Sequence, residues 1–170
     1  MLTNAPDEDG VTGEMRHQLR SAMTLHGLGQ VDAALAIAEK IVQKWPAYGQ
    51  ALSYLGQTLV TRKRRFADGL TILERAVEAA PADPYILYTL GWCEEFVANA
   101  LDRPKGAHQP VERRAADYYA RAKTHMLAAL ALEPEDKLRG DVEDILDVIA
   151  KATGEPWDLG EYERAAPRPR

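Results

Sequence analysis

LGQTLVTRKRRFADGLTILERAVEAAP, residues 55–81, is the stretch of sequence that decides the fold of this chain. It begins with Leu-Gly on an apolar helical face and crosses a basic turn at residues 62–65. A second run then carries Phe66, Gly69, Leu73 and Ala76 at three- and four-residue spacing, which is the period of a helix with one buried face. The stretch stops at Pro81 and therefore predicts a helical hairpin.

The second half of this hairpin has a copy on either side of it. Its five marker positions are Phe66, Gly69, Leu73, Ala76 and Pro81. The earlier copy lies 35 residues upstream, at Val31, Ala34, Ala38, Ile41 and Pro46. The later copy lies 53 residues downstream, at Tyr119, Ala122, Met126, Ala129 and Pro134, while the pair Leu55-Gly56 recurs 35 residues on at Leu90-Gly91. The difference between 53 and 35 predicts 18 additional residues between the two helices of the third unit.

A two-helix unit with Leu-Gly early, small residues in the middle and proline at the end resembles the tetratricopeptide repeat, whose period is about 34 residues. The resemblance covers residues 15–135. It departs from the family in the first unit, where Ser21-Ala22 stands in place of Leu-Gly, and in the missing aromatic near the start of each unit. It implies an all-α fold, a right-handed α-solenoid of three helix-turn-helix repeats with a C-terminal capping helix.

The chain is expected to divide into three parts. Residues 1–13 carry no periodic apolar pattern and are expected to be a disordered lead. The domain is expected to span residues 14–153, with repeats at about 15–48, 49–83 and 84–136 and a capping helix at 136–153. Residues 154–170 form a tail whose apolar members, Trp157, Leu159 and Tyr162, are expected either to plug a groove of the domain or to pack against another subunit.

The insertion in the third unit is expected to be helical rather than an open loop. Ala100 and Leu101 continue the apolar stripe of the preceding helix, and Ala115 and Tyr118 extend the following helix backward. Long structureless loops are uncommon in small domains. We therefore predict an extended helical hairpin with a polar tip at residues 99–114.

Composition limits the kind of partner and compartment. The net charge of −5 disfavours a nucleic-acid partner, because such proteins usually present a basic field. No apolar run approaches the roughly 18 residues of a membrane-spanning helix, and the N-terminus lacks the layout of a signal peptide. A single cysteine, Cys93, fits a reducing compartment. We expect a cytoplasmic protein with no nucleic-acid partner and no membrane insertion.

No constellation of catalytic or metal-binding residues is visible. The four histidines, His17, His26, His108 and His125, are scattered, and the sequence has no H-E-x-x-H, C-x-x-C or G-x-S-x-G motif. The basic turn at residues 62–65 lacks interleaved aromatic residues and is interpreted as a solvated turn rather than an anion site. We expect no enzyme, no cofactor and no metal.

In tetratricopeptide proteins the first helix of each unit lines a concave groove that holds a peptide. Carried over residue by residue, the resemblance implies a groove lined by Leu19, Met23, His26, Gln57, Val60, Tyr85, Tyr88, Trp92 and Glu95, beside Arg16, Gln50 and Ser53. The lysines and asparagines with which one branch of the family clamps a carboxylate are absent. Tyr and Trp contribute strongly at interfaces and Met adapts to varied ligands, so we predict an amphipathic helix or an extended apolar peptide as the partner. The alternative is that these side chains pack within the chain itself.

The sequence thus favours a non-catalytic adaptor or scaffold that binds a protein or peptide. Two related alternatives stay open: a secretion-type chaperone for a hydrophobic client, which size and repeat number suggest, and a non-catalytic subunit of an enzyme complex. Homo-oligomerisation through the tail or the capping helix is also left open.

Overall fold

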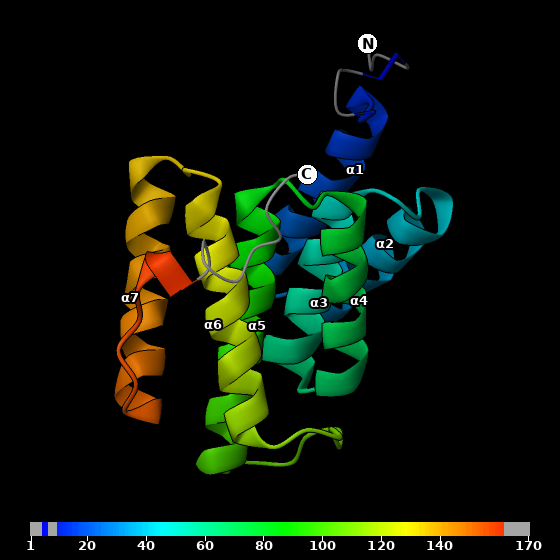
Figure 1. Ribbon diagram of the computed structural model, residues 1–170. Helices are drawn as coiled ribbons and strands as arrows, with labels where there is room; N and C mark the ends of the chain where they lie inside the picture. Colours follow the sequence, from blue (N-terminus) through cyan, green and yellow to red (C-terminus); the bar gives the residue numbers. More distant parts are fainter. Residues whose placement is uncertain (1–4, 7–9, 162–170) are drawn as a thin grey trace.

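The computed structural model describes residues 5–6 and 10–161, and every regular element in them is a helix. The α-helices in chain order are α1 (Gly13–Gly27), α2 (Val31–Lys44), α3 (Gly49–Lys63), α4 (Phe66–Ala79), α5 (Pro84–Asp102), α6 (Ala115–Ala131) and α7 (Asp136–Thr153). They stand side by side, with α1 and α2 at one edge and α7 at the other (Figure 1). The described residues contain no β-strand, so the all-α prediction is confirmed for them.

The helices pack as adjacent pairs, α1 on α2, α3 on α4 and α5 on α6. Each pair also contacts the next helices in the chain, because α2 packs on α3, both α3 and α4 pack on α5, and both α5 and α6 pack on α7. The buried side chains accordingly form three adjoining clusters along the row of helices, containing Leu52, Phe66 and Met126 respectively. A single pair would leave one apolar face open to water, and the next element along the row covers it.

Close approach of the helices in the α3–α4 and α5–α6 pairs depends on a glycine in each pair. A Cβ atom placed on Gly56 of α3 would lie only 2.6 Å from Leu73 Cγ on α4. A Cβ atom on Gly91 of α5 would lie 3.1 Å from Met126 Cε on α6. Gly91 follows Gly56 by 35 residues and Met126 follows Leu73 by 53, so positions related by the two sequence offsets make the same contact in both pairs.

The insertion differs from the helical hairpin expected at residues 99–114. Helix α5 does continue to Asp102, but residues 103–114 contain no helix. Pro104 and Pro110 account for this, because proline has no N–H to donate and its ring clashes with a preceding helical turn. The prediction of helix is therefore wrong beyond Asp102.

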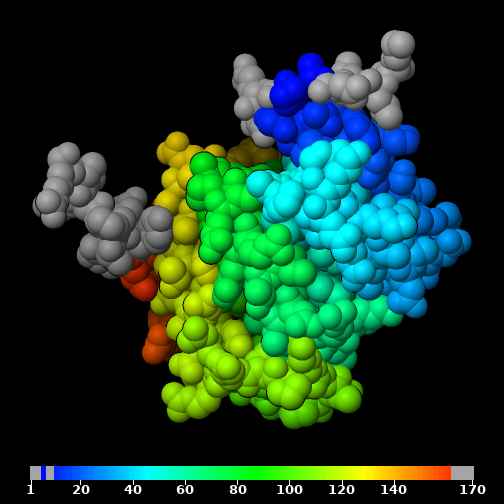
Figure 2. All heavy atoms as spheres, turned by 90° about the vertical axis from the view of Figure 1, so that its right-hand side faces the viewer, coloured from blue at the N-terminus to red at the C-terminus, as the bar shows by residue number. Residues whose placement is uncertain are grey.

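Residues 103–114 instead fold across the end of the α3–α4 pair, at the lower end of the molecule in Figures 1 and 2. The backbone N–H of Gln109 donates to Arg64 O at 2.9 Å, and Arg64 Nε donates to Ala107 O at 3.0 Å. The His108 ring stacks on Phe66 with 4.8 Å between ring centroids. Arg64, in the basic turn, closes α3 in the left-handed conformation with φ 52°. This turn thus anchors the insertion.

The two ends of the chain lie partly outside the described residues. Of the lead expected to be disordered, residues 1–4 and 7–9 lie outside them, and α1 begins at Gly13 after the Thr12 cap. In the tail, Trp157 and Leu159 pack against the α5–α6–α7 core cluster, and Trp157 Nε1 donates to Asp147 Oδ1 at 2.7 Å. Tyr162, also expected to take part, lies outside the description.

Candidate functional site

A groove of about 310 Å³ opens between α1, α3 and α5, the first helices of the three successive pairs. It is lined by Leu19, Met23, Gln50, Ser53, Tyr54, Gln57, Asp83, Tyr85, Ile86 and Thr89. The lining combines apolar side chains with uncharged amide and hydroxyl groups, and Asp83 is its one carboxylate. This mixture suits a segment that presents apolar side chains and needs a few hydrogen bonds for orientation.

Two large apolar side chains of this groove are exposed. Met23 is 52% exposed and Tyr85 is 53% exposed, whereas most of the large apolar residues described are buried. Tyrosine provides a rigid contact surface and methionine adapts its shape to the ligand. Met23 on α1 and Tyr85 on α5 are therefore the natural anchor residues for a partner.

Hydrogen bonds hold both walls of the groove in place. Tyr54 Oη lies 2.9 Å from His26 Nδ1, and their rings meet edge to face, which ties α3 to α1. Tyr85 Oη donates to Glu135 Oε1 at 2.5 Å, and the same carboxylate accepts the N–H of Leu138 at the start of α7. Side chains already held in place lose less conformational entropy when a partner binds.

The tyrosine pKa values reflect these surroundings. Burial raises the pKa of Tyr54 above its usual value. The hydrogen bond to Glu135 raises the pKa of Tyr85, and it lowers the pKa of the Glu135 carboxyl. Both phenols therefore stay protonated at neutral pH, and the single O–H of Tyr85 is used in its bond to Glu135.

The structure brings together only part of the groove that the sequence implied. Leu19, Met23, Gln57 and Tyr85 line the same hollow, although Leu19 is itself buried. His26 stands behind it and positions Tyr54.

Val60 does not lie on the groove surface. Its side chain is fully buried, and a Cβ atom on Gly69 would lie 2.6 Å from Val60 Cγ2. Val60 therefore fills the interface between α3 and α4, where a partner cannot reach it.

Tyr88, Trp92 and Glu95 lie further along α5 and do not line the groove. Tyr88 and Trp92 are half-buried against the α5–α6–α7 core, and burial raises the pKa of Tyr88. Glu95 is only 9% exposed, burial raises its pKa, and it forms no hydrogen bond or ion pair with any other described residue. These three residues share one face of α5.

Sequence analysis missed Tyr54 and Thr89 as lining residues. They follow Leu19 by 35 and 70 residues, so the 35-residue offset, which the pair Leu55-Gly56 and Leu90-Gly91 also shows, would have identified both. The groove positions of the first two units were instead aligned 34 residues apart, which matched Leu19 with Ser53 and missed Tyr54.

A second, more polar hollow of about 360 Å³ lies between α4, α6 and the insertion. Its floor is Glu94, which is 1% exposed. Arg121 Nε donates to Glu94 Oε2 at 2.7 Å, and His125 Nδ1 bonds Glu94 Oε1. Arg121 also pairs with Glu74 of α4 at 2.8 Å. Both oxygens of Glu94 are occupied, so this network ties three helices together and leaves no free base.

A third hollow, of about 510 Å³, lies where the turns before α3 and α5 meet the start of α1. Most of its lining is glycine, alanine and proline from these turns, which offers few anchoring side chains. It is a weaker candidate for a binding site than the groove between α1, α3 and α5.

Other chemistry finds little support in the part of the chain that the structure describes. No group of three or more His, Cys, Asp or Glu side chains there could hold a metal ion. Cys93 is fully buried, and burial raises the pKa of its thiol far above the usual range, so it is a packed side chain. No helix among residues 10–161 has both the length and the apolar character to cross a bilayer.

Comparison with known proteins gave no match, either to a protein-family model or to a curated protein sequence.

Proposed function

We propose that this chain is a tetratricopeptide-like, right-handed α-solenoid of three repeats capped by α7, and that it acts as a non-catalytic adaptor in the cytoplasm. Its partner is a protein segment bound in the groove between α1, α3 and α5. Two constant sequence offsets, and the equivalent glycine contacts of Gly56 and Gly91, support the repeat assignment.

The observation that carries the function is the exposure of Met23 and Tyr85 within one groove. An apolar side chain left half in water gains free energy when a partner covers it, by about 25 cal/mol per Å² of apolar surface. The two residues lie on opposite walls, and neither is covered by the described part of the chain. A partner that fills the groove would cover both.

The lining favours an amphipathic helix, or an extended apolar peptide, as the partner. Hydroxyl and amide groups of Ser53, Gln57 and Thr89 lie between the apolar anchors. A helix presents apolar side chains at i, i+3, i+4 and i+7 to such a groove and can direct polar side chains to these groups. A chaperone for a hydrophobic client would use the same surface, and the identity of the partner separates the two functions.

Membership in an enzyme complex as a non-catalytic subunit is compatible with the same groove. Catalysis by this chain itself has less support. In the described chain, Glu94 is the one buried acid that lies beside basic side chains. Arg121 and His125 already bond both oxygens of its carboxylate, so the carboxylate is poorly placed to accept a proton from a substrate.

The groove is tested with fluorescent amphipathic-helix peptides whose apolar face carries leucines. Met23→Asp is expected to weaken binding at least about tenfold, because an anchor residue of an interface contributes about 2 kcal/mol or more. Leu28→Asp is the matched control, since Leu28 is 69% exposed on the α1–α2 turn and does not line the groove. Circular dichroism checks that both variants fold. Equal binding by the wild type and the Met23 variant, or equal loss in both variants, would contradict the proposal.

A further inference from the structure

Glu95 is a nearly buried carboxylate without a partner. It is 9% exposed and makes no hydrogen bond or ion pair with another described residue. Among the described side chains, only Arg64 Nη2 is a nitrogen or oxygen atom that is both fully buried and unpartnered. The oxygens of Glu95 therefore still reach the surface. Buried carboxylates are otherwise almost always paired, because the loss of hydration has to be offset.

The neighbouring Glu94 shows what pairing looks like in the same helix. Glu94 is bound by both Arg121 and His125. For Glu95, burial is the one cause that shifts its pKa, and the shift is upward; no nearby cation offsets it. The described part of the chain thus pairs one of two adjacent carboxylates with basic side chains and provides none for the other.

Aromatic and acidic groups surround the place where a cation would enter. Trp92 lies three residues before Glu95, and Tyr88 lies seven residues before it. All three side chains therefore lie on one face of α5. Burial is the main cause that raises the pKa of Tyr88; on α7, the charges of Asp141 and Asp144 raise it further and that of Lys137 lowers it. Asp141 is paired with Lys137, whereas Asp144 is exposed and unpaired among the described residues. Asp144 therefore adds an uncompensated negative charge near the Tyr88 ring.

We propose that the segment bound in the groove carries a lysine or arginine beside its apolar face, and that this side chain seats against the Glu95 carboxylate next to Trp92. The inference rests on the proposed function, because the apolar face of the partner must first occupy the groove between α1, α3 and α5. A charged donor gives a desolvated carboxylate its strongest hydrogen bond. The Trp92 ring can contact the cation or its methylene stem.

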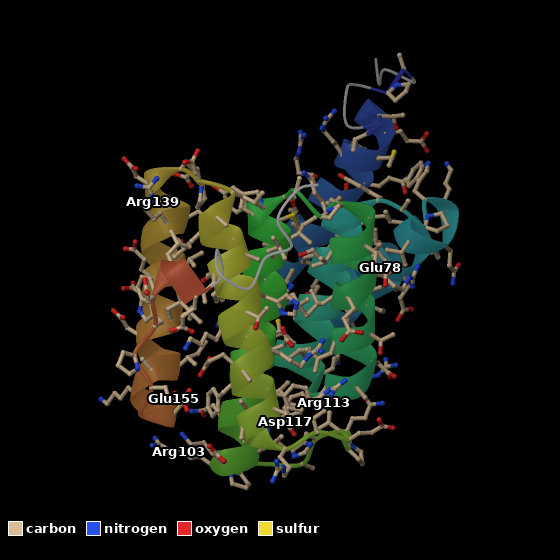
Figure 3. All side chains as sticks on the ribbon, viewed as in Figure 1. Glu78, Arg103, Arg113, Asp117, Arg139 and Glu155 are labelled. Atoms are coloured by element: carbon tan, nitrogen blue, oxygen red, sulfur yellow. The ribbon has the colours of Figure 1, made fainter. Side chains whose placement is uncertain are left out.

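The test uses two helical peptides that share one leucine face and differ at a single flanking position, lysine in one and glutamine in the other. At physiological ionic strength, the wild-type protein is expected to bind the lysine peptide about tenfold or more tightly than the glutamine peptide. Glu95→Gln is expected to reduce this ratio to less than about twofold, because the neutral amide no longer favours a cation over an amide. Glu78→Gln removes the same charge from an exposed position on α4 (Figure 3) and should keep the full ratio.

Each result decides one claim. If both peptides bind the wild type equally, or if Glu78→Gln lowers the ratio as much as Glu95→Gln does, the cation site is refuted while the groove stands. If neither peptide binds, the proposed function fails and this inference fails with it. A third peptide carries arginine at the flanking position. If Glu95→Gln weakens binding of this peptide more than it weakens binding of the glutamine peptide, the cation site is supported; an equal effect on both peptides refutes it.

Discussion

Glu94 and Glu95 are adjacent in the chain and lie in opposite surroundings. Successive side chains on a helix point about 100° apart. Glu94 therefore faces α6, where Arg121 and His125 bind it, while Glu95 points about 100° away and has no cation partner among the described residues. At the residue scale the function depends on this difference, because a desolvated unpaired charge reduces stability unless a partner neutralises it.

The effect of Glu95 on the free energy of unfolding depends on pH. Burial raises its pKa above the ordinary 4.5, so the folded chain holds the proton more tightly than the unfolded chain does. The contribution of Glu95 to stability is therefore highest below pH 4.5 and falls as the pH rises through the raised pKa of the folded state. We expect Glu95→Gln to raise the free energy of unfolding, relative to wild type, by more at neutral pH than at about pH 4. Urea unfolding at both pH values measures this, and a difference that does not change with pH would contradict it.

The prediction of individual groove residues was only as accurate as the alignment of the repeat units with one another. Met23, Gln57 and Tyr85 lie where the repeat pattern placed them, in one hollow. Val60 was misplaced, because it is one of several apolar positions on α3 and the pattern does not show which of them face α4. Sequence alone also gave no signal that Glu95 would lack a counter-charge, since that depends on which side chains of α6 and α7 reach it.

At the scale of the elements, the positions of the helices could be predicted from the sequence, whereas the path of the insertion at residues 103–114 could not. Apolar periodicity and prolines at the unit ends mark the paired helices. The path of residues 103–114 is fixed instead by contacts with residues some 40 positions earlier, such as the bond from Gln109 N to Arg64 O. Local patterns carry no information about such long-range contacts.

Gln109 serves as a remote cap for α4. Arg65, the N-cap residue of α4, makes no side-chain capping bond, and the N–H of Asp68 donates to Gln109 Oε1 at 2.9 Å instead. We expect Gln109→Ala to lower the free energy of unfolding by about 0.5–2 kcal/mol, the usual cost of losing a cap. Gln43→Ala, at an exposed position of α2, should change it by less than about 0.5 kcal/mol. Equal effects in urea unfolding would show that the insertion does not cap α4.

The close contact of α3 with α4 gives a second test at this scale. In Gly56→Ala the new methyl group would lie 2.8 Å from the backbone oxygen of Gly69, so the helices must separate, at a cost of about 1–3 kcal/mol or more. Gly140→Ala is the matched control, because nothing lies within 4 Å of its Cβ position in the middle of α7. It should stabilise the protein by about 0.5–1 kcal/mol. Thermal unfolding of the two variants should therefore shift in opposite directions, and a shared direction would refute the packing described.

At the scale of the whole molecule, neighbouring helix pairs make one continuous row, and the groove exists only because three of them align their first helices. Met23 lies on the first pair and Tyr85 on the third, so neither a single pair nor a changed stacking angle would bring them to one groove. The sequence predicted the pairs and their order. The shape of the groove was not predictable, because it depends on how each pair is rotated against the next.

The most direct test of the central claim is a map of backbone amide resonances while the leucine-faced helical peptide is titrated into the protein. We predict that the resonances that shift most belong to residues 19–23, 50–57 and 83–89, together on α1, α3 and α5. Shifts confined to α2, α4 and α6, or scattered shifts that never saturate, would show that the groove is not the binding surface.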